Sequence, residues 1–187
     1  IKRWLEVWDA ETVTAICQAN NEPPSHTLRV NPLKTSRQDF KAKLERDYPG
    51  AHIRDSDIAI QGLITQGLGN IGNSAWHENG WCSIQDESSM LVGDVLNPTP
   101  GASVIDLCAA PGGNATHLAE LMHGRGTVHA FDIHEHKINL IKAHAKRLGL
   151  HNVTAKQADA RDLPRRLSKV FDYVLLDAPC SGFGVIR

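Results

Sequence analysis

The stretch SVIDLCAAPGGNATHLAELMHGRGTVHAFD, Ser103–Asp132, decides the fold of this 187-residue chain. It opens with an apolar run at Ser103–Cys108, passes through a glycine loop, and reaches a second apolar run at Thr127–Asp132. Residues Asn114–Met122, between the two runs, have the composition of a helix. A strand, a loop, a helix and another strand in this order predict a β-α-β unit with parallel strands.

The same alternation continues toward the last residue. A helix is expected over His134–Leu148, ended by Gly149, because its apolar residues form one stripe: Ile138, Ile141, Ala145 and Leu148,. Strands are expected at NVTAKQ (152–157) and DYVLLD (172–177). Continuous apolar runs such as VIDL and YVLL are typical of parallel strands that are covered on both faces. Residues 81–187 are therefore predicted to form an α/β domain with right-handed crossovers.

The residues before this domain have a different composition. We expect a helix over residues 1–20, a short strand at 26–31 and a second helix from Ser36 to about Asp47,. Five glycines between residues 60 and 80 favour loops and short strands,. Residues 1–80 are therefore predicted to be a small α+β module.

Bulk composition excludes several classes of protein. The hydrophobic content of 41% and the charged content of 22% are typical of a globular protein,. No apolar run approaches the ~20 residues of a membrane span, and the first residues lack a signal peptide's apolar segment. We therefore expect no membrane partner, and because the chain lacks an initiator Met we expect a piece of a longer protein.

The four cysteines are scattered without a CxxC pair: Cys17, Cys82, Cys108 and Cys180. This pattern favours reduced thiols and a cytoplasmic location over a disulfide framework or a zinc finger. His134 and His136 are placed to pinch a metal ion, but one such pair supplies too few ligands, so no metal site is predicted.

An acidic residue stands at or just after the end of each predicted strand: Asp106, Asp132, Asp159 and Asp177. Ligands of parallel sheets bind at this edge, and Gly112 and Gly113 let the backbone pass close to one. The loop matches neither the P-loop motif nor the GxGxxG motif of dinucleotide-binding proteins. The alternative to a ligand-binding loop is a glycine turn with a purely structural role. An acid-rich edge suits a ligand with a ribose, an adenine, a positive charge and no phosphate. S-adenosylmethionine has these features, whereas a nicotinamide dinucleotide needs its pyrophosphate held at the loop.

Basic residues concentrate between Lys137 and Lys169, a stretch that contains nine Lys or Arg residues and only two acidic ones. Two interpretations remain open for this stretch, a solvated helix face and a surface that contacts RNA phosphates. Arg165 and Arg166 are the candidate RNA-binding residues.

Several motifs together give a family resemblance. The segments DLCAAPGGNATH, FDIHEHKINLIKAHAKRLGL, QADARDLP and FDYVLLDAPCSGFGVIR closely resemble the Nop/Sun family of RNA cytosine-C5 methyltransferases. The segments TLRVNP and GWCSIQDESSMLVGDVLNPTPG are most similar to the branch that acts on bacterial small-subunit ribosomal RNA. The resemblance covers nearly the whole chain. It implies a Rossmann-like methyltransferase sheet and an RNA-recruiting role for residues 1–80.

The resemblance also implies roles for individual residues. The methionine part of S-adenosylmethionine would lie against the loop Cys108, Ala109, Ala110, Pro111, Gly112, Gly113 and Asn114. Asp132 would hold the ribose hydroxyls, Asp159 would approach the adenine amine, and Asp177 would lie between the cofactor and the target base. Many relatives carry a lysine where this chain has Asn114; the resemblance therefore implies that Asn114 hydrogen-bonds near the cofactor's carboxylate, more weakly than a charged lysine would.

The family's sheet has seven strands, and the chain stops at Arg187, just past the fourth. The resemblance therefore implies a truncated catalytic domain with an exposed apolar edge. A later Thr-Cys-Ser segment, which carries the family's nucleophile, would follow Arg187. The two functional hypotheses are an enzyme that methylates C5 of a cytosine in small-subunit rRNA through a covalent cysteine adduct, and an RNA- and cofactor-binding fragment without turnover. No protein partner is predicted.

Three interpretations apply to Cys180. It is the attacking thiol, as the Pro-Cys of DNA cytosine-C5 methyltransferases would suggest, or a helper thiol that aids breakdown of the adduct, or a small buried filler. The family resemblance favours the helper, with Asp177 as the carboxyl group near N3 and N4 of the base.

Overall fold

The computed structural model describes residues 1–21, 26–163 and 169–181, and the chain divides into two compact units. Of the described residues, 1–21 and 179–181 belong to the first unit. It contains the 3-10 helix η1 (Trp4–Glu6) and the helix α1 (Ala10–Asn21). Asp9 begins α1, because its carboxylate accepts the backbone N–H of Thr12 at 2.8 Å,. The single helix predicted over residues 1–20 is thus two helices, separated where Asp9 caps the second.

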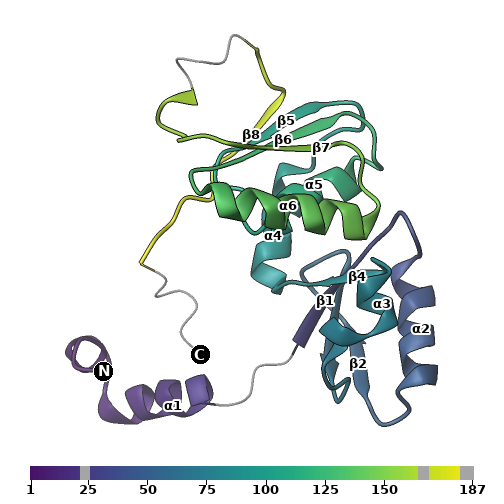
Figure 1. Ribbon diagram of the computed structural model, residues 1–187. Helices are drawn as coiled ribbons and strands as arrows, with labels where there is room; N and C mark the ends of the chain where they lie inside the picture. The colour runs from purple at the N-terminus through teal and green to yellow at the C-terminus, as the bar shows by residue number, and fades with distance from the viewer. Residues whose placement is uncertain (22–25, 164–168, 182–187) are drawn as a thin grey trace. The chain divides into compact units, whose positions relative to one another are not determined.

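The second unit, His26–Ala178, contains two sheets (Figure 1). The first sheet is antiparallel with the strand order β2-β3-β1-β4, and its strands are β1 (His26–Val30), β2 (His52–Asp55), β3 (Gly62–Gln66) and β4 (Cys82–Ile84). The predicted strand at 26–31 is confirmed as β1. Because β4 pairs with β1, this sheet extends past residue 80, where the sequence placed the end of the module.

Helix α2 (Arg37–Asp47) packs its buried Phe40 and Leu44 on this first sheet. Ser36 caps the helix as predicted, accepting the backbone N–H of Asp39 at 3.1 Å. The short helices η2 (Ile71–Asn73) and α3 (Ala75–Glu78) follow β3. Trp76 of α3 meets the ring of Phe40 edge-on, with 5.6 Å between ring centroids. An aromatic cluster therefore completes the core of the module.

The second sheet is parallel with the strand order β7-β6-β5-β8, which confirms the predicted α/β class. Its strands are β5 (Ser103–Asp106), β6 (Thr127–Asp132), β7 (Val153–Gln157) and β8 (Tyr173–Leu175). The helices α4 (Glu87–Leu96), α5 (Gly113–Leu121) and α6 (Glu135–Leu148) lie on one face of it (Figure 1). Helices α5 and α6 agree with the prediction to within a residue. Helix α4 was not predicted.

Apolar residues pack on both faces of the parallel sheet. Val104, Val128 and Ala130 face the helices, whereas Ile105 and Phe131 form a smaller cluster with Leu163 on the other face. Strand β8 is one of the two edge strands of this sheet among the described residues, and β7 is the other. Val174 of β8 is 56% exposed and the following Leu176 is 59% exposed, as expected of an apolar edge.

The two sheets of the second unit meet through buried polar contacts. Asn31, after β1, donates from Nδ2 to the carbonyl oxygens of Gly80 at 2.9 Å and of Leu148 at 3.2 Å. Arg147 of α6 donates to the carbonyl oxygen of Cys82 at 2.9 Å. Gly80 has φ of +72°, and a Cβ there would lie 2.2 Å from the carbonyl oxygen of Arg147, so only glycine fits this contact,.

Candidate active site

The candidate site lies where the order of the parallel strands reverses. Strands β6 and β7 continue on one side of β5, and β8 lies on the other side. In such sheets, ligands bind outside the carboxyl ends of the strands at this reversal. Asp106 ends β5, Asp132 ends β6, Asp159 follows β7 and Asp177 follows β8. We call these four carboxylates the acidic rim.

The glycine loop between β5 and α5 borders the acidic rim. Gly112, at the N-terminus of α5, has φ of +111°, and a Cβ there would lie 3.1 Å from Cα of Ile141. Both its backbone conformation and the closeness of α6 therefore require glycine. The backbone N–H of Ala109 donates to the carbonyl oxygen of Phe131 at 2.7 Å, which ties the loop to β6. Because α5 begins here, its free N–H groups favour an anionic group such as a carboxylate.

Asp132 fastens the loop to the second strand of the sheet. Its side chain is buried, its Oδ2 accepts the backbone N–H of Ala110 at 3.3 Å, and its Oδ1 accepts that of His134 at 2.9 Å. Each carboxylate oxygen can accept a further hydrogen bond. The residue predicted to hold ribose hydroxyls thus stands beside the glycine loop in a fixed orientation.

Asp106 is a buried acid to which the sequence gave no individual role. It is 1% exposed, its Oδ1 accepts the backbone N–H of Cys108 at 3.3 Å, and its Oδ2 has no hydrogen-bond partner among the described residues. Burial raises the pKa of this carboxyl to about 7, and the charges of Asp177 and Asp132 add to the effect,. A cationic ligand beside the rim would compensate this charge. The signal in the sequence was its place at the end of a strand, which says nothing of its burial.

Asp159 is held by an arginine from its own turn. Arg161 donates from Nε to Oδ1 at 3.0 Å and to Oδ2 at 3.1 Å. These hydrogen bonds, with that from the backbone N–H of Arg161, lower the pKa of Asp159 to about 2. An adenine amine at Asp159 would therefore share the carboxylate with a guanidinium, a contact that the sequence did not predict.

Asp177 is exposed, and its Oδ2 accepts a hydrogen bond from Nδ2 of Asn114 at 3.1 Å. Two residues separated by 63 positions are thus joined across the end of the sheet. Asn114, which the sequence assigned to the cofactor, is already engaged with the predicted catalytic carboxylate.

The two cysteines near the motifs differ in their surroundings. Burial raises the pKa of the Cys108 thiol, and the neighbouring acids, with Asp106 first, raise it further. This thiol is therefore protonated at neutral pH and is a poor nucleophile. Cys180 is exposed, is not part of a disulfide, and belongs to the first compact unit.

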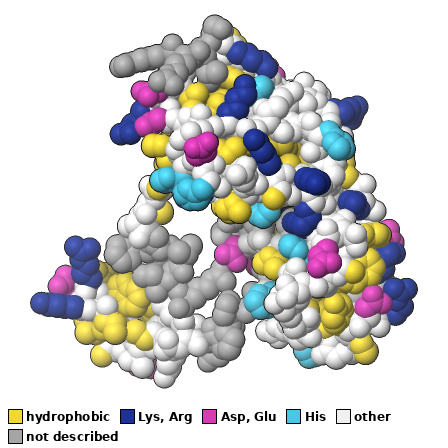
Figure 2. Space-filling model, viewed as in Figure 1, with side chains coloured by type: hydrophobic (Ala, Val, Ile, Leu, Met, Phe, Trp, Pro, Cys, Tyr) yellow, Lys and Arg dark blue, Asp and Glu magenta, His cyan; other side chains and the backbone are white. Residues whose placement is uncertain are grey.

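The basic stretch divides between structural and exposed side chains. Arg165 and Arg166 lie outside the described residues. Arg147 faces the first sheet, where it also donates to the carbonyl oxygen of His77 at 2.6 Å, so it is not available to RNA. Lys142 and Lys146 on α6 are exposed. Figure 2 shows Lys and Arg side chains spread over this face, with acids and histidines between them, rather than gathered in one patch.

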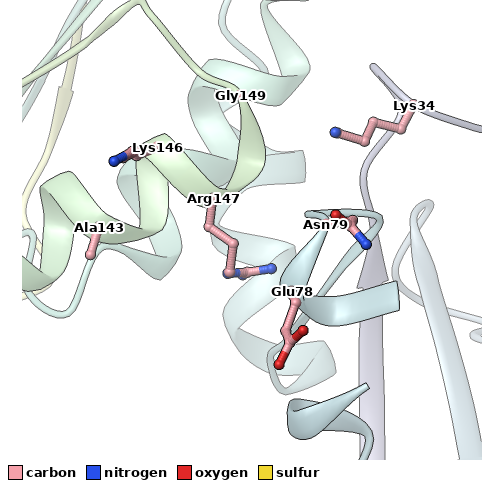
Figure 3. Close-up of a pocket in the computed structure, with 7 residues that line it drawn as sticks. All are labelled: Lys34, Glu78, Asn79, Ala143, Lys146, Arg147 and Gly149. Atoms are coloured by element: carbon pink, nitrogen blue, oxygen red, sulfur yellow. The ribbon is translucent and has the colours of Figure 1, made fainter. Parts of the chain in front are cut away.

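A cavity of about 460 Å³ lies beside the carboxyl end of α6 (Figure 3). Residues next to the first sheet and residues of helix α6 line it together: Lys34, Glu78, Asn79, Ala143, Lys146, Arg147 and Gly149. Several of these residues stand at the carboxyl end of α6, which begins beside Asp132 and is 14 residues long. At 1.5 Å per residue, that end is roughly 20 Å from the rim. This cavity is therefore not where a ligand of the glycine loop would bind.

The described residues contain neither a membrane-spanning helix nor a cluster of metal ligands. Within them, no helix is long and apolar enough to span a membrane. No group of three or more His, Cys, Asp and Glu side chains in the same ranges could hold a metal ion.

Comparisons with known proteins agree on one kind of protein. Residues 94–187 match the family described as 16S rRNA methyltransferase RsmB/F, and residues 1–69 match the RsmF/B-like ferredoxin-like domain. The chain is 42% identical, over its full length, to 41% of a probable ribosomal RNA small subunit methyltransferase B from Bacillus subtilis. It is 39% identical to 43% of the corresponding protein from Serratia proteamaculans.

A solved structure also matches nearly the whole chain. A methyltransferase homologue from Pyrococcus horikoshii superposes with a TM-score of 0.86 at 32% identity, covering 99% of this chain and 60% of its own. The chain spans less than half the length of the two curated relatives from Bacillus subtilis and Serratia proteamaculans. The match supports the Rossmann-like fold expected from the motifs.

Proposed function

Because the chain belongs to the 16S rRNA methyltransferase RsmB/F family, we propose that it is part of an enzyme that methylates C5 of a cytosine in small-subunit ribosomal RNA. Enzymes of this family use S-adenosylmethionine, which supplies a methyl group on a positively charged sulfur. The observation that carries the proposal is the acidic rim around the glycine loop, with the carboxylate of Asp177 bonded to Asn114 at its edge.

The described residues fit this cofactor. A bound cation would favour the charged form of Asp106, whose buried Oδ2 has no hydrogen-bond partner among the described residues, and the N-terminus of α5 suits a carboxylate,. Asp132 would accept the ribose hydroxyls, and Asp159 would accept the adenine amine beside Arg161. The positive charge, the carboxylate and the nucleoside of S-adenosylmethionine would therefore each meet a complementary group.

On the RNA side, we infer that Asp177 contacts N3 and N4 of the cytosine. Position 5 of cytosine is a poor nucleophile until a thiolate adds at position 6 and forms a C6–S bond. C5 would then take the methyl group from the positively charged sulfur of the cofactor, which becomes a neutral thioether. A base would remove the C5 proton, and the electron pair of the C5–H bond would re-form the C5=C6 double bond as the C6–S bond breaks and releases the thiolate. A carboxyl group at N3 and N4 stabilises the charge that develops on the ring. The target base must be unstacked, which single-stranded RNA permits most readily.

We infer that the attacking thiol lies in a segment that follows Arg187, and that Cys180 helps the adduct break down. The family resemblance supports this assignment, as does the partial coverage of the relatives. Cys180→Ala in the full-length enzyme should then accumulate a covalent protein–RNA adduct. Methyl transfer by residues 1–187 alone would contradict it. Binding of RNA and cofactor by this chain without turnover is the expected result, and residues 1–80 would recruit the RNA.

The chemistry itself is tested by nucleoside analysis. The full-length enzyme, small-subunit rRNA and S-adenosylmethionine should yield 5-methylcytidine, measured by mass spectrometry of the digested RNA. Asp177→Asn should reduce this yield by about 100-fold or more, since general acid–base groups contribute roughly 10²–10⁴-fold. N4-methylcytidine as the product, or no methylated cytidine, would show that the proposal is wrong.

A further inference from the structure

A chain of hydrogen bonds runs from the first sheet to the proposed catalytic carboxylate. Arg29 on β1 donates from Nη1 to Oε1 of Gln85. Gln85 donates from Nε2 to Oδ1 of Asn114 at 3.2 Å, and Asn114 donates from Nδ2 to Oδ2 of Asp177 at 3.1 Å. All four residues belong to the second compact unit. Asp177 is therefore linked to two residues, Arg29 and Gln85, that precede the methyltransferase sheet.

The first member of this chain is firmly held. Arg29 is 1% exposed, and its Nε donates to Oε2 of Glu120 at 2.9 Å. Its Nη2 donates to Oγ1 of Thr116 at 3.0 Å, and its Nη1 also donates to the carbonyl oxygen of Gly113 at 2.9 Å. A planar guanidinium with this many partners has one orientation. It also contacts the glycine loop directly, through Gly113.

The chemistry of the four groups fixes the direction of every bond. A guanidinium only donates, so Gln85 must turn its oxygen toward Arg29 and its NH₂ toward Asn114. Asn114 must then turn its oxygen toward Gln85 and its NH₂ toward Asp177. An isolated amide can be reversed at little cost, but here reversal would place oxygen against oxygen. The carboxylate of Asp177 therefore meets a donor.

We propose that Gln85 is a positioning residue for methyl transfer, which with Arg29 and Asn114 fixes Oδ2 of Asp177 and leaves Oδ1 for the target base. This inference rests on the proposed function. It gives Asn114 a task other than binding the cofactor. It also makes the geometry of the catalytic carboxylate depend on the packing of the first sheet.

Kinetics of the full-length enzyme test this role. Gln85→Met keeps the length of the side chain but removes both hydrogen bonds. It should lower kcat about three- to tenfold, the effect of losing the one hydrogen bond that orients Asn114, and leave the Kd for S-adenosylmethionine within about twofold. Gln38→Met is the matched control. Gln38 also donates to a carboxylate, that of Asp55 at 2.7 Å, but neither residue belongs to the hydrogen-bond chain from Arg29 to Asp177. At saturating RNA, Gln38→Met should leave kcat unchanged, because a side chain of the RNA-recruiting residues 1–80 would act on KM and not on the chemical step.

Two further measurements keep the inference falsifiable. The kcat of the double variant Asn114→Ala/Gln85→Met should be no lower than that of Asn114→Ala alone, because both substitutions interrupt the same series of hydrogen bonds. In NMR spectra of protein labelled with ¹⁵N at asparagine, the side-chain amide signal of Asn114 should shift in Gln85→Met and not in Gln38→Met.

An unchanged kcat in Gln85→Met, multiplying effects in the double variant, or an unmoved Asn114 signal would overturn the role of Gln85. If the wild-type enzyme methylates no cytosine, the proposed function fails. The Asn114 signal then still decides whether the chain of hydrogen bonds exists.

Discussion

The ion pair between Arg29 and Glu120 gives the most quantitative prediction. Both side chains are almost fully buried, at 0% and 1% exposure, and their charged atoms lie 2.9 Å apart. Arg29→Met would leave the carboxylate of Glu120 in the interior without its cation. Breaking a buried pair on one side costs about 3–5 kcal/mol of unfolding free energy. With a urea m-value of about 2 kcal/mol/M, the unfolding midpoint should fall by about 1.5–2.5 M.

The loss should depend on pH in a defined direction. Burial raises the pKa of Glu120 above its ordinary value, although the charge and hydrogen bond of Arg29 oppose the rise. A raised folded-state pKa means that stability is fully present below the unfolded-state pKa and is lost as pH rises through the folded-state value. Without Arg29 the pKa rises further. The deficit of Arg29→Met should therefore be largest near neutral pH and shrink toward pH 4.

Urea denaturation of the full-length enzyme, followed by circular dichroism at several pH values, measures this deficit. Arg46→Met is the control, since Arg46 pairs with Asp47 but is 71% exposed, and such pairs contribute about 0–1 kcal/mol,. The double variant Arg29→Met/Glu120→Met should recover most of the loss. A deficit below about 1 kcal/mol, a deficit independent of pH, or no recovery in the double variant would refute the reasoning.

Three other predictions concern the site. Asp132→Ala should weaken S-adenosylmethionine about tenfold or more in a calorimetric titration, because it removes the proposed ribose contacts; unchanged affinity would exclude that role. Without cofactor, Asp106 should cost up to about 4 kcal/mol of unfolding free energy as pH rises from 4 to 7, since its folded-state pKa is raised to about 7, and Asp106→Asn should abolish this fall,. An equal fall in the variant would assign the pH dependence to another group. Reversing the charges of Arg165 and Arg166 should weaken RNA binding and flatten its salt dependence in a filter-binding assay, whereas no change would favour a solvated face.

Local patterns in the sequence were sufficient for the parallel sheet. The apolar run of β5, the stripe of α6 and the cap at Ser36 depend on neighbouring residues, and each is confirmed. Helix α4 was missed, although Asp86 before Glu87 is a typical start and Asn97 in the left-handed region a typical end,.

The buried network could not be predicted from one sequence. Arg29 and Glu120 are 91 positions apart, and an arginine in a strand is normally exposed,. The strand-end position of Asp177 indicated its place at the site, but not its contact with Asn114. Contacts of this kind depend on how the two sheets pack, which periodicity and spacing do not encode.

The central claim is methylation of C5 through a covalent adduct, and trapping that adduct tests it most directly. RNA transcribed with 5-fluorocytidine has no C5 proton to lose, so the C6–S bond cannot break after methyl transfer. The full-length enzyme and S-adenosylmethionine should therefore form a protein–RNA complex that survives denaturing electrophoresis, and Cys180→Ala should still form it. Methyl transfer to unmodified rRNA with no such complex on the fluorinated RNA would contradict the account.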